Sequence, residues 1–139
     1  HIDASAQTDR SISRNLSAQF IEAWLVERPG DTVIRRDLSA TPPGFVTGEW
    51  IAACFTPEEE RTTEMHASLM ESDELIAELE AADVVVLGTP MYNYGMPAVL
   101  KAWVDRVIRI GKTFSAEKPS SHSLQKVNSG FQKAASAKR

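Results

Sequence analysis

The residues best suited to chemistry lie in two loops, and the first of them, Ser5 to Ser13, carries four hydroxyl side chains. A helical pattern follows it directly. Because a helix N-terminus offers free backbone N–H groups and a partial positive charge, this loop can bind a phosphate without a lysine. The alternative interpretation is that Ser11 or Ser13 only caps the helix, as serine commonly does. The loop matches neither the Walker nor the dinucleotide glycine pattern.

The second loop, Thr89 to Pro97, follows the most apolar run of the chain and holds two tyrosines, two methionines, an asparagine and a glycine. Aromatic faces can stack on a planar ligand, and backbone amides near Gly95 can approach ring heteroatoms. The alternative is an aromatic loop that packs on the next helix. Pairing with a phosphate-type loop on the neighbouring strand favours a ligand, because a mononucleotide needs both of its ends held.

The elements that must position these loops alternate between short apolar runs and longer helical patterns, which predicts an α/β fold with a parallel sheet. We expect the end of a first strand at residues 1–4 and a second strand near an edge at residues 32–37. The third strand, residues 83–88, is apolar enough to be buried on both faces. Ligands of such sheets bind beyond the carboxyl ends of the strands, where both loops are expected.

Helical patterns are predicted at five places along the chain. A helix over about residues 13–27 should bury one face, made of Leu16, Phe20, Ile21, Trp24 and Leu25. A weak helix covers residues 49–55, another begins at Thr56–Glu59, and a second start follows at Ser72–Asp73. The last helix, residues 98–110, should bury Leu100, Trp103, Val104, Val107 and Ile108.

Composition indicates one globular domain, with 139 residues, 42% of them hydrophobic and 24% charged. The net charge of -4 disfavours nucleic acid and anionic membrane as partners. The lone Cys54 has no companion for a disulfide or a metal site, which favours a reducing compartment and hence the cytoplasm. No apolar run approaches the roughly 20 residues that span a bilayer, so no membrane partner is expected.

Motifs along the chain resemble one known family. The run Gly88–Pro97, continuing through Leu100–Val107 to Gly111–Phe114, is similar to the signature of FMN-dependent NADH-azoreductases, also called NADH:quinone oxidoreductases. Asp3–Ser5 and Ser11–Ser17 resemble that family's phosphate loop and first helix. The resemblance covers roughly His1 to Phe114. It implies a flavodoxin-like, doubly wound parallel sheet in three layers, α/β/α.

The resemblance also implies a flavin site and an activity. Ser5, Ser11, Ile12 and Ser13 would hold the FMN phosphate, and Met91, Tyr92, Asn93 and Tyr94 would line the isoalloxazine ring. NADH would reduce the flavin and leave, and a quinone or azo compound would then take the electrons, a ping-pong hydride relay. The family further implies a homodimer with the flavin near the subunit interface.

No catalytic side chain is expected, because the cofactor performs the difficult step. The residues agree with this, since the histidines, His1, His66 and His122, are scattered and no nucleophile–base arrangement emerges. Each histidine is expected to be solvated or structural. Cys54 beside Phe55 is expected to be a small buried hydrophobe.

The family pattern stops after Phe114. Residues 115–139 are rich in Ser, Lys and Ala, so we interpret them as a polar, irregular tail following a partial FMN-binding domain at residues 1–114. Strands four and five of the sheet are then missing, which predicts a fragment or truncated member that binds FMN poorly or not at all. Two alternatives to the enzyme stay open. One is a flavodoxin-type flavin-binding electron carrier, and the other is an inactive truncated remnant.

Overall fold

The computed structural model of the chain describes residues 1–114, and the predicted polar tail over residues 115–139, including His122, lies outside them. The strands are β1 (Ile2–Asp3), β2 (Arg36–Asp37) and β3 (Leu87–Gly88). The helices are α1 (Ile12–Glu27), α2 (Gly48–Phe55), the 3-10 turn η1 (Glu58–Glu60), α3 (Thr63–Ala81) and α4 (Ala98–Val107). None of the helices within this part is long and apolar enough to cross a membrane.

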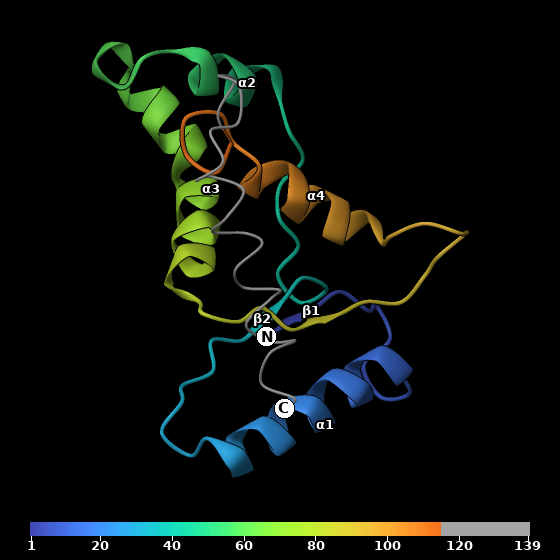
Figure 1. Cartoon of the computed structure of the whole chain (residues 1–139). Helices are drawn as coiled ribbons and strands as arrows, with labels where there is room; N and C mark the ends of the chain where they lie inside the picture. The colour runs from blue at the N-terminus through green and yellow to red at the C-terminus, as the bar shows by residue number, and fades with distance from the viewer. Residues whose placement is uncertain (115–139) are drawn as a thin grey trace.

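The sheet is parallel, with the order β2-β1-β3. Asp3 of β1 pairs with Asp37 on one side and Gly88 on the other, so the three strands end level with one another. Figure 1 shows α1 on one face of this sheet, with α3 and α4 on the opposite face. The predicted α/β class, parallel sheet and three-layer arrangement are therefore confirmed, and β2 lies at an edge as expected.

The core lies between the sheet and α4, where Ile2, Leu38 and Leu100 are buried and Trp103 packs against them. A neighbouring cluster joins the two helices of this layer through Leu75 of α3 and Val107 of α4. The stripe predicted for the last helix is thus largely buried or half-buried. Ile108 is the exception, because α4 ends at Val107 and the Ile108 side chain is exposed.

The buried face predicted for α1 is only partly present. Ile21 is buried together with Ser17, but Leu16 and Phe20 are exposed and Trp24 and Leu25 are half-buried. The physical reason is the small area of the sheet, since α1 packs on two-residue strands that cannot cover a helix of 16 residues. Periodicity predicted the correct element, but not the extent of its burial.

The helix starts predicted at Thr56 and Ser72 are both wrong. Residues 58–60 form only the 3-10 turn η1, and α3 begins at Thr63, where the Thr62 hydroxyl accepts a hydrogen bond from the Met65 N–H. The helix then runs through Ser72 without a break. Ser72 is fully buried and donates to the Arg106 carbonyl at 2.6 Å, so its polarity serves a tertiary contact with α4 and not a cap.

The run predicted as a strand buried on both faces is also only partly correct. Regular strand structure is limited to β3, residues 87–88, while Val85 and Leu87 are 46% and 42% exposed. Within residues 1–114, β3 pairs with β1 alone, so its other edge and part of its surface have no covering layer. As predicted, Cys54 is buried, and His66 is exposed.

Candidate functional site

A cavity of about 400 Å³ opens beyond the carboxyl ends of β1 and β3. This volume lies in the range of about 300–1,000 Å³ that is typical of small-molecule sites. The cavity is lined by Ser5, Gln7, Arg10, Ser11, Ile12, Ser13, Leu16, Thr89, Pro90 and Tyr92. The two loops singled out in the sequence therefore form the walls of one cavity.

One wall is the N-terminus of α1, which can bind an anion. Ser11 is the N-cap, and its hydroxyl accepts a 3.3 Å hydrogen bond from the Arg14 N–H. The Ser11 and Ser13 hydroxyl oxygens lie 3.1 Å apart, so the two hydroxyls are neighbours at the start of α1. The N–H groups of Ile12 and Ser13, in the first turn, have no intrahelical acceptor. Ser11 thus caps the helix and lines the cavity, and the two interpretations of this serine are compatible.

The charge of the lining residues also suits an anion. Arg10 lines the cavity and stands directly before the N-cap, which the sequence analysis did not single out. No carboxylate is among the lining residues of the described chain. Hydroxyls, helix N–H groups and one guanidinium form a donor set that phosphate oxygens can accept from.

The other wall belongs to a tight hairpin. Tyr92 and Gly95 exchange two backbone hydrogen bonds of 2.9 Å, and Asn93 and Tyr94 between them have φ values of 49° and 63°. Positive φ at both central residues matches a type I′ turn. Asparagine tolerates this conformation, but for tyrosine it is strained. Such strain is characteristic of functional loops.

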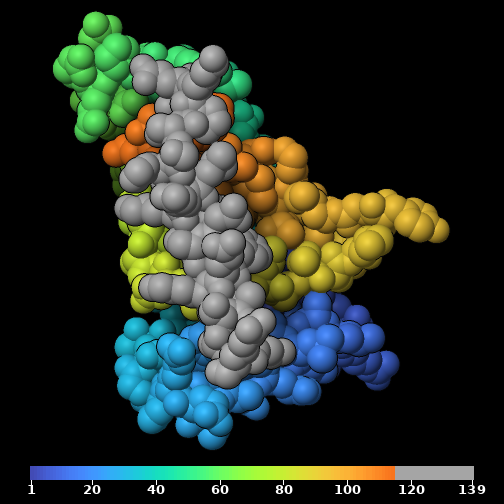
Figure 2. Space-filling model, viewed as in Figure 1, coloured from blue at the N-terminus to red at the C-terminus, as the bar shows by residue number. Residues whose placement is uncertain are grey.

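The hairpin projects from the body of the molecule, as the segment after β3 shows in Figures 1 and 2. The Tyr94 side chain is completely exposed, and Met91 is 72% exposed. Of the eight residues predicted for the FMN site, five line the cavity: Ser5, Ser11, Ile12, Ser13 and Tyr92. Met91, Asn93 and Tyr94 lie on the same hairpin but outside the lining of the cavity.

Residues that the sequence analysis missed hold the first loop in place. Arg14 donates to both carboxylate oxygens of Asp37 at 2.7 Å, and also to the Ser5 carbonyl. The hydrogen bonds from Arg14 hold the pKa of Asp37 at about 2, well below its ordinary value. The sequence did contain a signal for this contact, because Asp37 is a charged residue at the carboxyl end of a predicted strand, where ligand sites of parallel sheets form.

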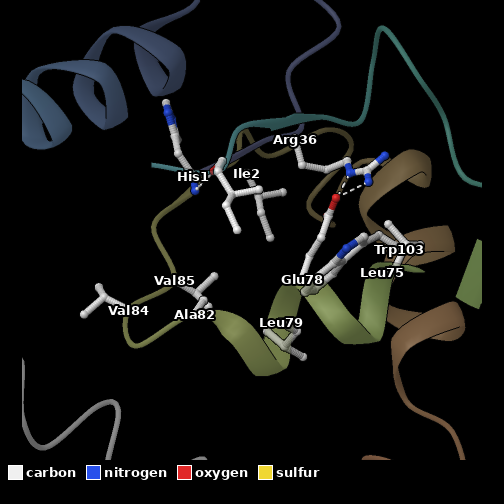
Figure 3. A pocket seen from close by; sticks show the side chains of 11 residues that line it. His1, Ile2, Arg36, Leu75, Glu78, Leu79, Ala82, Val84, Val85 and Trp103 are labelled. Carbon is white, nitrogen blue, oxygen red and sulfur yellow. Dashed lines mark hydrogen bonds and ion pairs between the residues drawn. The ribbon is translucent and has the colours of Figure 1, made fainter. Parts of the chain in front are cut away.

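A second cavity lies at the opposite, amino-terminal ends of the strands, and Figure 3 shows it from close by. Arg36 pairs with Glu78 at its rim, next to Trp103. Its volume of about 40 Å³ is far too small for a nucleotide and suits a water molecule or two. The cavity at the carboxyl ends is therefore the candidate site.

Comparison with known proteins identifies the family of the chain. A model of a family with the flavodoxin-like fold matches residues 1–133. The chain belongs to this flavodoxin-like family. Solved structures share its arrangement: an azoreductase from Bacillus anthracis str. Sterne superposes with a TM-score of 0.76 at 27% identity, covering 86% of this chain and 60% of that one.

Curated relatives of the chain carry a more specific name. FMN-dependent NADH:quinone oxidoreductase 2 of Colwellia psychrerythraea is 51% identical over 122 residues, which cover 83% of this chain and 56% of that protein. The protein of the same name in Idiomarina loihiensis is 48% identical over 121 residues, covering 82% of this chain and 50% of that protein. The chain thus spans about half the length of the curated relatives it matches.

Proposed function

We propose that this chain supplies the phosphate-binding side of an FMN site in an FMN-dependent NADH:quinone oxidoreductase that also reduces azo compounds. The observation that carries the proposal is that the α1 N-terminus and the loop after β3 line the same cavity. Relatives at about 50% identity that bear this enzyme name support it. So does the fold shared with azoreductases.

In this proposal Ser5, Ser11, Ile12 and Ser13 hold the phosphate. The hydroxyls of Ser11 and Ser13 and the first N–H groups of α1 act as hydrogen-bond donors. The dipole of the helix also favours the negative charge of a phosphate at this end. The ring lies toward the hairpin, where Met91, Tyr92, Asn93 and Tyr94 line it. When bound there, FMN would supply two-electron transfer between NADH and a quinone or azo acceptor, in the two half-reactions of a ping-pong relay.

The protein side of this chemistry is binding and orientation. No side-chain acid, base or nucleophile is assigned, and the cavity walls serve to fix and orient the ligand. We also propose a homodimer, because Met91, Tyr94 and Met96 expose apolar surface together on the projecting hairpin. The buried free thiol of Cys54 supports a reducing compartment such as the cytoplasm.

Steady-state oxidation of NADH with a quinone, in the presence of added FMN, tests this function. FMN is added in excess, because weak binding of FMN was expected from the sequence. Under this condition we expect quinone-dependent turnover that Ser13→Ala lowers through still weaker FMN binding, since the Ser13 hydroxyl contacts only Ser11 in the described chain. Thr8→Ala, in the same loop but outside the cavity lining, is the matched control. Flavin binding without NADH oxidation would instead identify an electron carrier.

A further inference from the structure

The Ser5 carbonyl oxygen is held by an unusual number of donors. Arg14 donates to it from Nε at 3.1 Å and from Nη2 at 2.6 Å, and the Ser39 hydroxyl donates at 2.7 Å. Ser5 itself is buried, with 2% of its surface exposed. These donors come from α1 and from the loop after β2, so a carbonyl of the phosphate loop is fixed from two other elements.

The orientation of Arg14 is fixed in turn by Asp37. The guanidinium makes two parallel hydrogen bonds of 2.7 Å to the carboxylate, and its side chain is only 13% exposed. Asp37 also accepts from the Ser39 N–H at 2.9 Å. The Asp37 carboxylate and the Ser5 carbonyl together accept hydrogen bonds from all three guanidinium nitrogens of Arg14, so these nitrogens are already bonded to protein groups. Arg14 is therefore poorly placed to bind a phosphate itself.

The other side of the same peptide unit faces the second loop. The Ala6 N–H donates to the Tyr92 hydroxyl at 3.2 Å, across 86 positions of sequence. In a trans peptide the C=O and N–H point in opposite directions, so donors that fix the Ser5 carbonyl also fix the direction of the Ala6 N–H. The Ser5–Ala6 peptide thus ties the phosphate loop to the hairpin.

We propose that Arg14, aligned by Asp37, is a positioning residue that fixes the Ser5–Ala6 peptide and, through Tyr92, the separation of the two cavity walls. This inference rests on the proposed function, because its consequence is selectivity for a ligand that carries a phosphate. Arg14 contributes geometry, and the donors to the phosphate are the hydroxyls and N–H groups of the first turn of α1.

The test compares the affinities of Arg14 variants for FMN and for riboflavin, which lacks the phosphate, by fluorescence titration. We expect Arg14→Gln to reduce the preference for FMN by about tenfold or more, and Arg14→Lys not to restore it, since an ammonium cannot replace the fork. Arg28→Gln is the matched control, because Arg28 lies at the far end of α1 over Trp24. Equal weakening of both ligands, or an unchanged preference, would overturn the proposal.

A second readout does not depend on flavin. In the flavin-free chain, the amide resonance of Ala6 and the ring resonances of Tyr92 should shift in Arg14→Gln and stay in place in Arg28→Gln. If these resonances do not change in Arg14→Gln, the positioning role of Arg14 is wrong, whatever the flavin titrations show. A wild-type chain that does not prefer FMN over riboflavin would count against the proposed function alone. Should Arg14→Gln not fold, Asp37→Asn removes the alignment while it keeps the charge of Arg14, and the same shifts are expected.

Discussion

The Ser17 hydroxyl donates a 3.0 Å hydrogen bond to the Asp3 carboxylate beside the backbone of Gly88. A Cβ atom at Gly88 would lie 2.5 Å from both Asp3 Oδ1 and Ser17 Oγ. At this point α1, β1 and β3 meet, and β3 leads directly into the hairpin. The glycine that opens the hairpin motif is therefore required by the packing of the three elements that carry the site.

Gly88→Ala should destabilise the chain by about 1–3 kcal/mol, because short, mostly buried side chains have little room to move away from the added methyl group. Urea denaturation followed by circular dichroism measures the change. Gly30→Ala is the control, since nothing lies within 4 Å of a Cβ built there, and its effect should stay within about 0.5 kcal/mol. Equal effects of the two substitutions would show that the junction is looser than described.

The Arg14–Asp37 pair should make stability depend on acid pH. Arg14 lowers the pKa of Asp37 from 3.8 to about 2, so the carboxylate contributes stability above its unfolded pKa and loses this contribution as the pH falls toward the folded value. Asp37→Asn should therefore be less stable than the wild type at neutral pH. The difference in unfolding free energy should shrink as the pH is lowered from about 4 toward about 2. A difference that is constant over this range contradicts the pairing.

Ser72→Ala should cost about 1–3 kcal/mol, because the hydroxyl joins two buried groups. It donates to the Arg106 carbonyl at 2.6 Å and accepts from Arg109 at 3.1 Å, and the serine is fully buried. Ser68→Ala is the control on the same helix, since its hydroxyl bonds only to the Met65 carbonyl within the helix. Thermal unfolding compares the two variants, and similar transition temperatures would argue against the interhelical role.

Tyr94→Gly should leave the chain as stable as before or stabilise it by up to about 1 kcal/mol, because glycine adopts a positive φ without steric cost. The same substitution should weaken the stacking of a flavin ring on the hairpin, and so raise the Kd for FMN and for riboflavin alike. Stability and flavin affinity are measured on one preparation. A clear loss of stability would mean that the exposed tyrosine makes structural contacts.

The parallel sheet and the position of the site could be predicted from the sequence because they depend on the alternation of apolar runs with helical patterns and on the loops that follow the strands. A continuous apolar run ended by a loop identifies β3, and the rule that ligands bind at the carboxyl ends of parallel strands correctly predicted that Ser11 and Tyr92 line one cavity. The hairpin conformation was less predictable. Its Asn93–Tyr94 pair has tyrosine where a type I′ turn usually has glycine, so the sequence does not carry the usual signal for this turn.

The features that the sequence analysis missed depend on tertiary contacts. Ser72 followed by Asp73 has the sequence signature of a helix start, but both residues lie in the middle of the continuous helix α3. Their side chains accept hydrogen bonds from Arg109, which follows α4. The role of Arg14 depends on the register that places Asp37 level with Asp3. Periodicity cannot reveal such pairings, because the partners lie 23 positions apart on different elements.

We propose that the N-terminus of α1 holds the phosphate of FMN. Titration of the ¹⁵N-labelled chain with FMN, and separately with riboflavin, tests it through the amide resonances of Ile12 and Ser13. We expect large shifts of these two amides with FMN and small ones with riboflavin, together with shifts at Tyr92 for both ligands. Equal shifts at Ile12 and Ser13 for the two ligands, or FMN-induced shifts that spare these amides, would contradict it.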